Sequence, residues 1–205
     1  RPHVSTVTNL APDHLDYMDS LEAYYESKMR IYENTNADDY FIRNVDDENV
    51  VKYAQNIPCH VIDFSLKRKD VDLYKDDKYV YYKDTQLFTL SDLKIVGEFN
   101  CGNAMMASCM AYLMGVSLFN IQEVIREFSG VEHRIEYVDT IDNVRFYNDS
   151  KATNTHAACA GLSAFEKNVI LLCGGKDKHI SFDDLKQYDG VVKKCISFGQ
   201  TKDKF

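Results

Sequence analysis

Apolar residues recur at helical spacing in several segments of this chain. The clearest is a stripe at Leu21, Tyr24, Tyr25, Met29 and Tyr32, where spacings of three and four predict an amphipathic helix. The residues Asp19-Ser20-Leu21-Glu22 resemble a capping box and predict its start. Further helices are expected over residues 103–114, 118–128 and 155–162.

Between these helices the chain alternates apolar and polar residues with the two-residue period of β-strands. Residues 1–8 predict one strand, and residues 40–95 predict several short strands, including a hairpin with the turn Lys75-Asp76-Asp77-Lys78. A second hairpin is expected over residues 134–147 and an apolar strand over 169–173. Strands that alternate with helices indicate an α/β fold, which we divide into two domains near Gly130.

The composition is that of an ordinary globular protein. Hydrophobic residues make up 45% and charged residues 27% of the 205 residues, which is sufficient for a packed core. A net charge of -8 disfavours an electrostatic nucleic-acid surface, so we expect no nucleic-acid partner. We also expect no membrane span, because no apolar run approaches the roughly 18 residues required. The six cysteines are scattered without a C-x-x-C pair, which favours buried thiols over disulfides or a zinc site.

The run from Asn148 to Asn154 contains only small, polar or charged residues, and it joins an expected strand to an expected helix. The first N–H groups of a helix favour anions. Asp149 could accept hydrogen bonds from hydroxyl groups there, and Lys151 could bind phosphate. The alternative is a simple helix cap, with Thr153 or Asn154 as the capping residue.

Lys28 falls on the apolar stripe of the first expected helix, four residues after Tyr24 and seven after Leu21. This position predicts a lysine directed toward the protein interior. The alternative is snorkelling, in which the aliphatic stem covers apolar surface while the ammonium group reaches water.

Three other groups have competing interpretations. Asn100 and Asn103 lie near the expected start of a helix, where an asparagine can cap, and Asn103 also offers the amide pattern that complements adenine. Arg134 begins a hairpin, either as a surface charge or as a forked donor for phosphate. The residues Gly174-Gly175-Lys176-Asp177-Lys178 follow an apolar strand, where open α/β sheets bind ligands, or they form a solvated turn.

Six segments, in order, resemble motifs of the Mur ligase family. They are residues 9–16, 27–33, 44–47, 97–103, 132–134 and 148–154, and they span nearly the whole chain. The resemblance implies an α/β fold in two parts. Residues 1–130 would be the C-terminal portion of the family's central ATP-binding domain, and residues 131–205 the N-terminal portion of its Rossmann-like C-terminal domain.

The resemblance also implies cofactors and site residues. In the intact enzyme ATP and Mg²⁺ would be bound, and Lys28 would be carbamylated and act with His14 as a metal ligand. In these 205 residues alone, Lys28 would be a plain or only weakly modified lysine. A lone loop histidine is otherwise a surface polar group. The implied ATP contacts, which would draw the two domains together, come from Asn100, Asn103, His133, Arg134 and Asp149. Lys151 would lie between ATP and the incoming amino acid, which Thr153 and Lys178 would bind.

The string Asp149-Ser150-Lys151-Ala152-Thr153 most resembles family members that add D-glutamate to UDP-N-acetylmuramoyl-L-alanine. That reaction is an ADP-forming amide ligation through an acyl phosphate in peptidoglycan precursor synthesis, and its enzymes would be cytoplasmic monomers. The alternatives are another Mur or folylpolyglutamate-type ligase, and a non-catalytic module that binds a nucleotide or a peptidoglycan precursor.

One family motif has no counterpart in this chain. The sequence contains no G-x-x-x-x-G-K-[ST] phosphate loop, and it does not begin with methionine. We therefore interpret the chain as an internal piece of a longer enzyme. Because positioning of the phosphates is most of phosphoryl-transfer catalysis, we expect the 205 residues to have no ligase activity by themselves.

Overall fold

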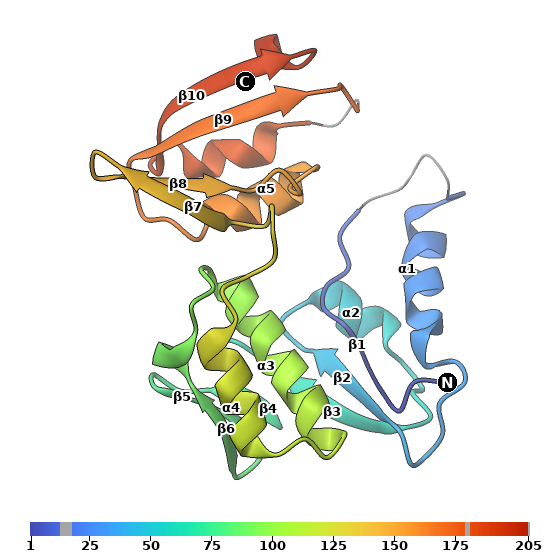
Figure 1. Cartoon of the computed structure of the whole chain (residues 1–205). Helices are drawn as coiled ribbons and strands as arrows, with labels where there is room; N and C mark the ends of the chain where they lie inside the picture. Colours follow the sequence, from blue (N-terminus) through green and yellow to red (C-terminus); the bar gives the residue numbers. More distant parts are fainter. Residues whose placement is uncertain (13–17, 179–180, 205) are drawn as a thin grey trace. The chain divides into compact units, whose positions relative to one another are not determined.

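A computed structural model describes residues 1–12, 18–178 and 181–204 (Figure 1). The chain divides into two compact units. Unit 1 comprises residues 1–94 and 100–128, and unit 2 comprises residues 95–99 and 129–205. The assignment of residues 1–130 and 131–205 to two family domains stays a prediction.

Unit 1 is built on a six-stranded sheet with the strands in sequence order. Its first four strands run parallel, and the last two continue the sheet from the fourth strand in antiparallel pairs, so that the fold is α/β with a hairpin extension. The predicted hairpin is confirmed, and Tyr74 stacks on Tyr81 across it with ring centroids 5.3 Å apart. The strands are β1 (Val4–Val7), β2 (Tyr40–Asn44), β3 (His60–Phe64), β4 (Leu73–Lys75), β5 (Tyr79–Tyr82) and β6 (Thr85–Thr89).

Helices cover both faces of this sheet. Phe41 on β2 is fully buried in a core that includes Tyr25 of α1 and Val50 of α2. Successive strand residues face opposite sides, and the other face receives α3, whose Met106 sulfur accepts a hydrogen bond from Thr6 on β1. The helical elements are α1 (Leu21–Met29), η1 (Arg30–Tyr32), α2 (Glu48–Tyr53), η2 (Leu90–Asp92), α3 (Glu98–Leu113) and α4 (Leu118–Glu127).

Gly102 allows α3 to approach the sheet closely. A Cβ atom at this position would lie 3.2 Å from the Phe64 ring on β3 and 3.3 Å from the Leu66 side chain, which is tighter than ordinary van der Waals contact. The absence of a side chain at residue 102 therefore sets the distance between the helix and the sheet.

Several sequence expectations about unit 1 were wrong. Residues 40–95 were expected to form short strands, and the prediction missed α2, which at six residues is too short to show a helical period. Helix α3 begins at Glu98, whereas its start was expected at residue 103. The N-cap of α1 is Ser20, one residue later than the capping-box position. Among the six cysteines, only Cys109 is buried.

Asp46 and Asp47 fasten the carboxyl ends of three parallel strands. Asp46 follows β2 and accepts hydrogen bonds from the Ser65 hydroxyl at 2.6 Å and the Leu66 N–H at 2.7 Å, just beyond β3. Asp47 caps α2 by accepting from the Val50 N–H at 2.8 Å, and its other oxygen accepts from the Leu10 N–H at 3.2 Å, beyond β1. Two adjacent carboxylates thus connect segments far apart in sequence.

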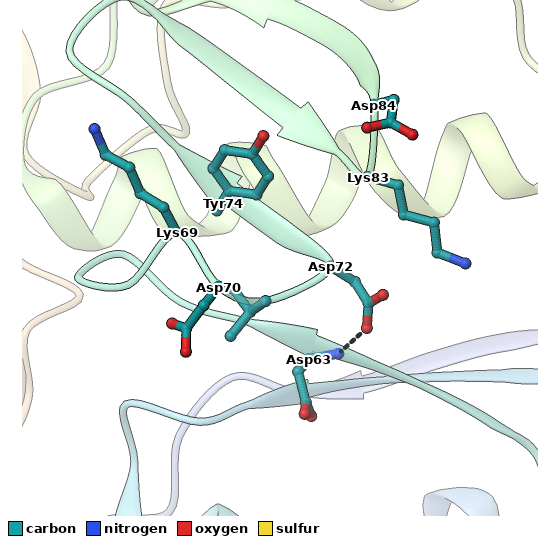
Figure 2. A pocket seen from close by; sticks show the side chains of 8 residues that line it. Asp63, Lys69, Asp70, Asp72, Tyr74, Lys83 and Asp84 are labelled. Atoms are coloured by element: carbon teal, nitrogen blue, oxygen red, sulfur yellow. Dashed lines mark hydrogen bonds between the residues drawn. The ribbon is translucent and has the colours of Figure 1, made fainter.

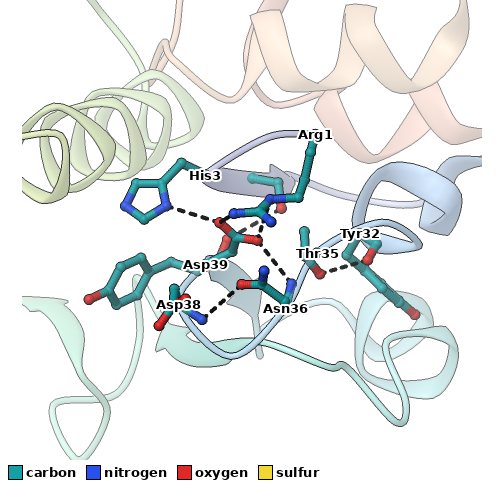
Figure 3. A network of polar contacts seen from close by, with 9 residues as sticks. Arg1, His3, Tyr32, Thr35, Asn36, Asp38 and Asp39 are labelled. Atoms are coloured by element: carbon teal, nitrogen blue, oxygen red, sulfur yellow. Dashed lines mark hydrogen bonds and ion pairs between the residues drawn. The ribbon is translucent and has the colours of Figure 1, made fainter.

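Asp39, just before β2, is a fully buried carboxylate whose partners include His3 and Arg1 near the start of the chain (Figure 3). Its Oδ1 lies 3.0 Å from His3 Nδ1, and its Oδ2 lies 3.0 Å from Arg1 Nε and accepts from the Asn36 N–H at 2.9 Å. The hydrogen bond with His3, followed by that with Asn36, lowers the pKa of Asp39. These partners keep the buried group ionised.

Unit 2 contains a hairpin and a parallel strand pair. Strands β7 (Glu136–Ile141) and β8 (Val144–Asn148) pair antiparallel, as predicted, around Asp142 and Asn143, whose φ angles of 51° and 64° suit a two-residue hairpin turn. Strands β9 (Val169–Gly175) and β10 (Val192–Gly199) pair in parallel. The remaining elements are α5 (Thr155–Leu162), η3 (Asp183–Tyr188) and η4 (Lys202–Lys204).

Replacing Asp47 by alanine is expected to lower the free energy of unfolding of unit 1 by roughly 1–3 kcal/mol, because both the α2 cap and the bond to Leu10 are lost. Denaturant unfolding followed by circular dichroism measures this change. The matched control is Asp77→Ala, at an exposed turn residue, which should change the value by less than about 0.5 kcal/mol. Equal effects of the two substitutions would contradict the role of Asp47.

Asp39→Asn is expected to weaken the pH dependence of stability. The pKa of Asp39 is lowered in the folded state, so its contribution is present above the ordinary carboxyl pKa of about 4 and is lost as the pH falls through the folded value. The difference in unfolding free energy between wild type and variant should therefore shrink below about pH 4. Denaturant unfolding across this range tests it, with exposed Asp38→Asn as the control. A constant difference would count against this account.

Candidate active site

The run from Asn148 to Asn154 lies at a strand-to-helix junction, as predicted. Strand β8 ends at Asn148 and α5 begins at Thr155. The Asn154 side chain caps α5 by accepting a hydrogen bond from the Ala157 N–H at 2.8 Å. The cap and a ligand site are compatible, because one side chain satisfies one N–H group and leaves the rest of the helix start available.

Asp149 is held between a turn and a helix. Its Oδ1 accepts a hydrogen bond from the Ile135 N–H at 3.1 Å. A Cβ atom at Gly161 on α5 would lie 2.5 Å from its Oδ2, so glycine is what allows the carboxylate to sit against the helix. Burial raises the pKa of Asp149, while the Ile135 bond and the charge of Arg134 oppose the shift. The group is thus desolvated and fixed in orientation.

The turn that meets Asp149 has strained backbone. His133 and Ile135 have φ angles of 67° and 44°, and a β-branched residue rarely adopts the second value. His133 contributes three of the hydrogen bonds that hold the turn. The His133 carbonyl accepts from the Lys151 N–H at 3.0 Å, its N–H donates to Glu136 Oε2 at 2.8 Å, and its Nδ1 lies 2.8 Å from Asn148 Nδ2. Arg134 is exposed within this turn.

The structure also brings together Thr153 and Lys178, the pair expected to bind the amino acid. The Lys178 ammonium group donates a hydrogen bond to the Thr153 carbonyl at 3.3 Å, and both residues are exposed. Unit 2 therefore places two cations, Lys151 and Lys178, on the segment before α5 and on the loop that touches it. With the cation of Arg134 beside Asp149, this donor set fits an anionic ligand such as a nucleotide phosphate.

The candidate residues of unit 1 depart from their expected environments. Asn100 is not a helix cap, because α3 begins two residues earlier, and its side chain is buried at 8% exposure. Asn103 lies on the second turn of α3 and is exposed. His14 lies outside the described residues.

Lys28 does not point into the interior. The residue is exposed, and its ammonium group lies 5.0 Å from the centre of the Tyr24 ring. The buried side of α1 is formed by Tyr24, Tyr25 and Met29, and the long lysine stem reaches past it to solvent. This is the snorkelling arrangement, and it removes the argument that a buried cation favours carbamylation.

The expected Mg²⁺ site has no counterpart in the described part of the chain. There, no group of three or more His, Cys, Asp or Glu side chains is arranged to hold a metal ion. An exposed lysine offers an ammonium group, whereas Mg²⁺ requires oxygen donors. The described residues alone therefore do not fit the ion. Among the same residues, no helix combines the length and apolarity needed to cross a bilayer.

A pocket of about 440 Å³ in unit 1 is lined by none of these candidates (Figure 2). Three of its carboxylates already have protein partners. Asp63 pairs with Arg43 at 2.8 Å, Asp70 pairs with Arg68 at 2.8 Å, and Asp72 accepts from the Asp63 N–H at 3.1 Å. The pocket is lined by Asp63, Lys69, Asp70, Val71, Asp72, Tyr74, Lys83 and Asp84. These charged groups do not single out a ligand.

Sequence reasoning missed the residues that hold the candidate site. Ile135 and Gly161 carried no signal, because a positive φ angle and a close approach by a carboxylate are tertiary properties. Asn148 and the pair Asp46 and Asp47 did lie within family-like segments. Their roles as hydrogen-bonding links follow only from the contacts they make.

The architecture and the ligand-facing residues define an α/β protein with a candidate anion site at a strand-to-helix junction. A family model described as the Mur ligase middle domain matches residues 1–111. Since this match covers more than half of the chain, the chain belongs to the Mur ligase family.

Two named relatives are similar along the entire chain. A protein of Geobacillus sp. (strain WCH70) named UDP-N-acetylmuramoylalanine–D-glutamate ligase is 41% identical over 206 residues, covering 100% of this chain and 46% of the relative. A protein of the same name from Staphylococcus aureus is 37% identical over 205 residues, covering 100% of this chain and 45% of the relative. The chain thus spans about half the length of these relatives.

Solved structures share the fold at low identity. MurF from Acinetobacter baumannii has a TM-score of 0.76 at 16% identity, with 97% of this chain and 47% of that chain covered. MurC from Thermotoga maritima has a TM-score of 0.69 at 18% identity, with 98% and 47% covered. These likenesses establish the fold alone.

Gly161→Ala is expected to displace the Asp149 carboxylate, because the added methyl group occupies its place. The amide of Ile135 should then exchange faster with solvent, and the raised pKa of Asp149 should fall toward its ordinary value as the group moves into water. Nuclear magnetic resonance measures both. The matched control is Gly190→Ala, where a Cβ atom meets nothing within 4 Å. An unchanged hydrogen-exchange rate of the Ile135 amide in Gly161→Ala would contradict this interpretation.

Proposed function

We propose that this chain is part of an ATP-dependent, ADP-forming ligase that adds D-glutamate to UDP-N-acetylmuramoyl-L-alanine in peptidoglycan precursor synthesis. The observation that carries the proposal is 41% identity, across the whole chain, to a relative named for that reaction. The geometry of unit 2 supports it, because an oriented carboxylate and exposed cations gather at one strand-to-helix junction.

The proposed chemistry follows from the weakness of a carboxylate as an electrophile. Transfer of the γ-phosphoryl group of ATP to the carboxylate of the muramoyl-alanine substrate makes an acyl phosphate. The amino group of D-glutamate attacks its carbonyl carbon, and phosphate leaves. Negative charge accumulates on the transferring group, so exposed guanidinium and ammonium groups near it would lower the barrier.

In this proposal each residue of unit 2 has a distinct task. Asp149, held in place by the hydrogen bond from the Ile135 N–H, accepts hydrogen bonds from the ribose hydroxyls. Arg134 binds the phosphates, and the neighbouring residue His133 has a strained backbone with a positive φ angle. Lys151 lies between the phosphates and the amino acid, and Lys178 binds the D-glutamate carboxylate beside Thr153.

The roles in unit 1 rest on the family resemblance. Asn100 and Asn103 would contact the nucleotide base. Mg²⁺ would supply a Lewis acid in the complete protein, with His14 and a carbamylated Lys28 among its ligands; the exposure of Lys28 gives no independent physical support for that modification. A cytoplasmic monomer remains the expectation for the complete protein.

Arg134→Ala in the protein expressed from the complete gene is expected to reduce kcat/KM by about 10²–10³-fold, the usual cost of removing a donor to transition-state charge. The assay is phosphate release that requires ATP, D-glutamate and the muramoyl-alanine precursor together. The matched control is Arg145→Ala, another exposed arginine of unit 2, which should retain activity within about twofold.

The same assay separates the proposed function from its alternatives. A wild-type protein that binds ATP but releases no phosphate with all substrates present would be a binding module. Release with a different amino acid in place of D-glutamate would indicate another ligase of the family. Full activity in Arg134→Ala would leave the ligase assignment intact but remove Arg134 from the site.

A further inference from the structure

Two thiols in unit 2 lie in contact. The sulfur atoms of Cys173 on β9 and Cys195 on β10 are 3.4 Å apart, within the range of a thiol hydrogen bond. Cys195 lies opposite Leu171 and Cys173 lies opposite Ser197, so the two cysteines occupy neighbouring positions on the same face of the parallel pair. Their contact follows from the strand register.

The two thiols differ in accessibility. Cys195 is exposed, whereas Cys173 is half-buried. Burial, followed by the hydrogen bond from Cys195, raises the pKa of Cys173 to about 12. A small oxidant would therefore meet Cys195 first, and Cys173 would be the thiol already in contact with the product.

A bond between these sulfurs requires the backbones of the two strands to shift, because the cysteines occupy diagonal positions of the pair. A disulfide requires a separation of about 2.05 Å, so the sulfurs must approach by roughly 1.4 Å. Strand β10 has a register irregularity between Val192 and Lys194, immediately before Cys195, where the ladder is already interrupted and the backbone can adjust.

We propose that Cys173 and Cys195 form a modification site that a small-molecule disulfide oxidises to an intramolecular disulfide. The Cys195 thiolate, after losing its proton to solvent, attacks one sulfur of the oxidant, forming a mixed disulfide and releasing one thiolate. The Cys173 sulfur, deprotonated in turn, attacks the Cys195 sulfur and expels the second thiolate. Both cysteines are oxidised and the oxidant is reduced to two thiols, which balances electrons and protons.

The bond would close a covalent loop around the segment that carries Lys178. This segment is already tied to the end of β10, because the Asp177 N–H donates to Gln200 Oε1 at 3.1 Å and Asp177 pairs with Lys204 at 2.6 Å. Oxidation would add a covalent link between β9 and β10 to these contacts of Asp177. The inference stands independently of the proposed ligase function, since it concerns the thiols alone.

Incubation of the 205-residue chain with oxidised glutathione tests the proposal. Of the six cysteines, two should become inaccessible to a thiol reagent under denaturing conditions, and peptide mapping should join Cys173 to Cys195. Dithiothreitol should restore both. Cys195→Ser and Cys173→Ser should each abolish the cross-link, whereas the control Cys159→Ser, at another cysteine of unit 2, should retain it.

Other products would overturn the proposal. A stable glutathione adduct on Cys195 with Cys173 still reduced would show that the buried thiol cannot complete the exchange. Linkage of a different pair, or persistence of all thiols at an oxidant excess that modifies an exposed model thiol, would show that the contact between the sulfurs does not direct oxidation.

Discussion

The carboxylates of Asp46 and Asp47 are the constraint on which unit 1 depends. Parallel strands in an α/β sheet present their connecting loops at one edge, and these loops lack the ladder bonds that order the strands. Asp46 fixes the loop after β3, while Asp47 fixes the segment after β1 and begins α2. Ser65, held by Asp46, in turn accepts hydrogen bonds from two further backbone N–H groups. A few charge-assisted bonds thus organise the edge where ligands of such sheets bind.

Unit 2 uses a carboxylate in a related way. Asp149 joins the turn at Ile135 to α5, as Asp47 joins a loop to α2. The difference is that Asp149 is desolvated, carries a raised pKa and stands next to an exposed arginine. Strain in the turn and close approach to Gly161 are tolerated there. Strained backbone is typical of positions whose geometry is needed to bind a ligand.

Periodicity predicted the elements that are long or strongly patterned. Helices α1 and α4 and both hairpins were confirmed, because local spacing and turn residues determine them. The cap, which the sequence left open between Thr153 and Asn154, is Asn154. The failures have a common cause. The environment of Lys28, the start of α3 and the contact between Asp149 and Gly161 depend on which surfaces meet in the folded chain. A pattern along one segment contains no information about the partner segment.

The close approach at Gly102 links the placement of two candidate residues. A helix moves as a rigid rod, so a methyl group added at residue 102 would lift α3 from β3 and carry Asn100 and Asn103 with it. The Phe64 ring and any side chain at residue 102 would therefore compete for the same space. During evolutionary drift, a larger residue at one position would be accommodated by a smaller one at the other, so that these two positions would change as a pair.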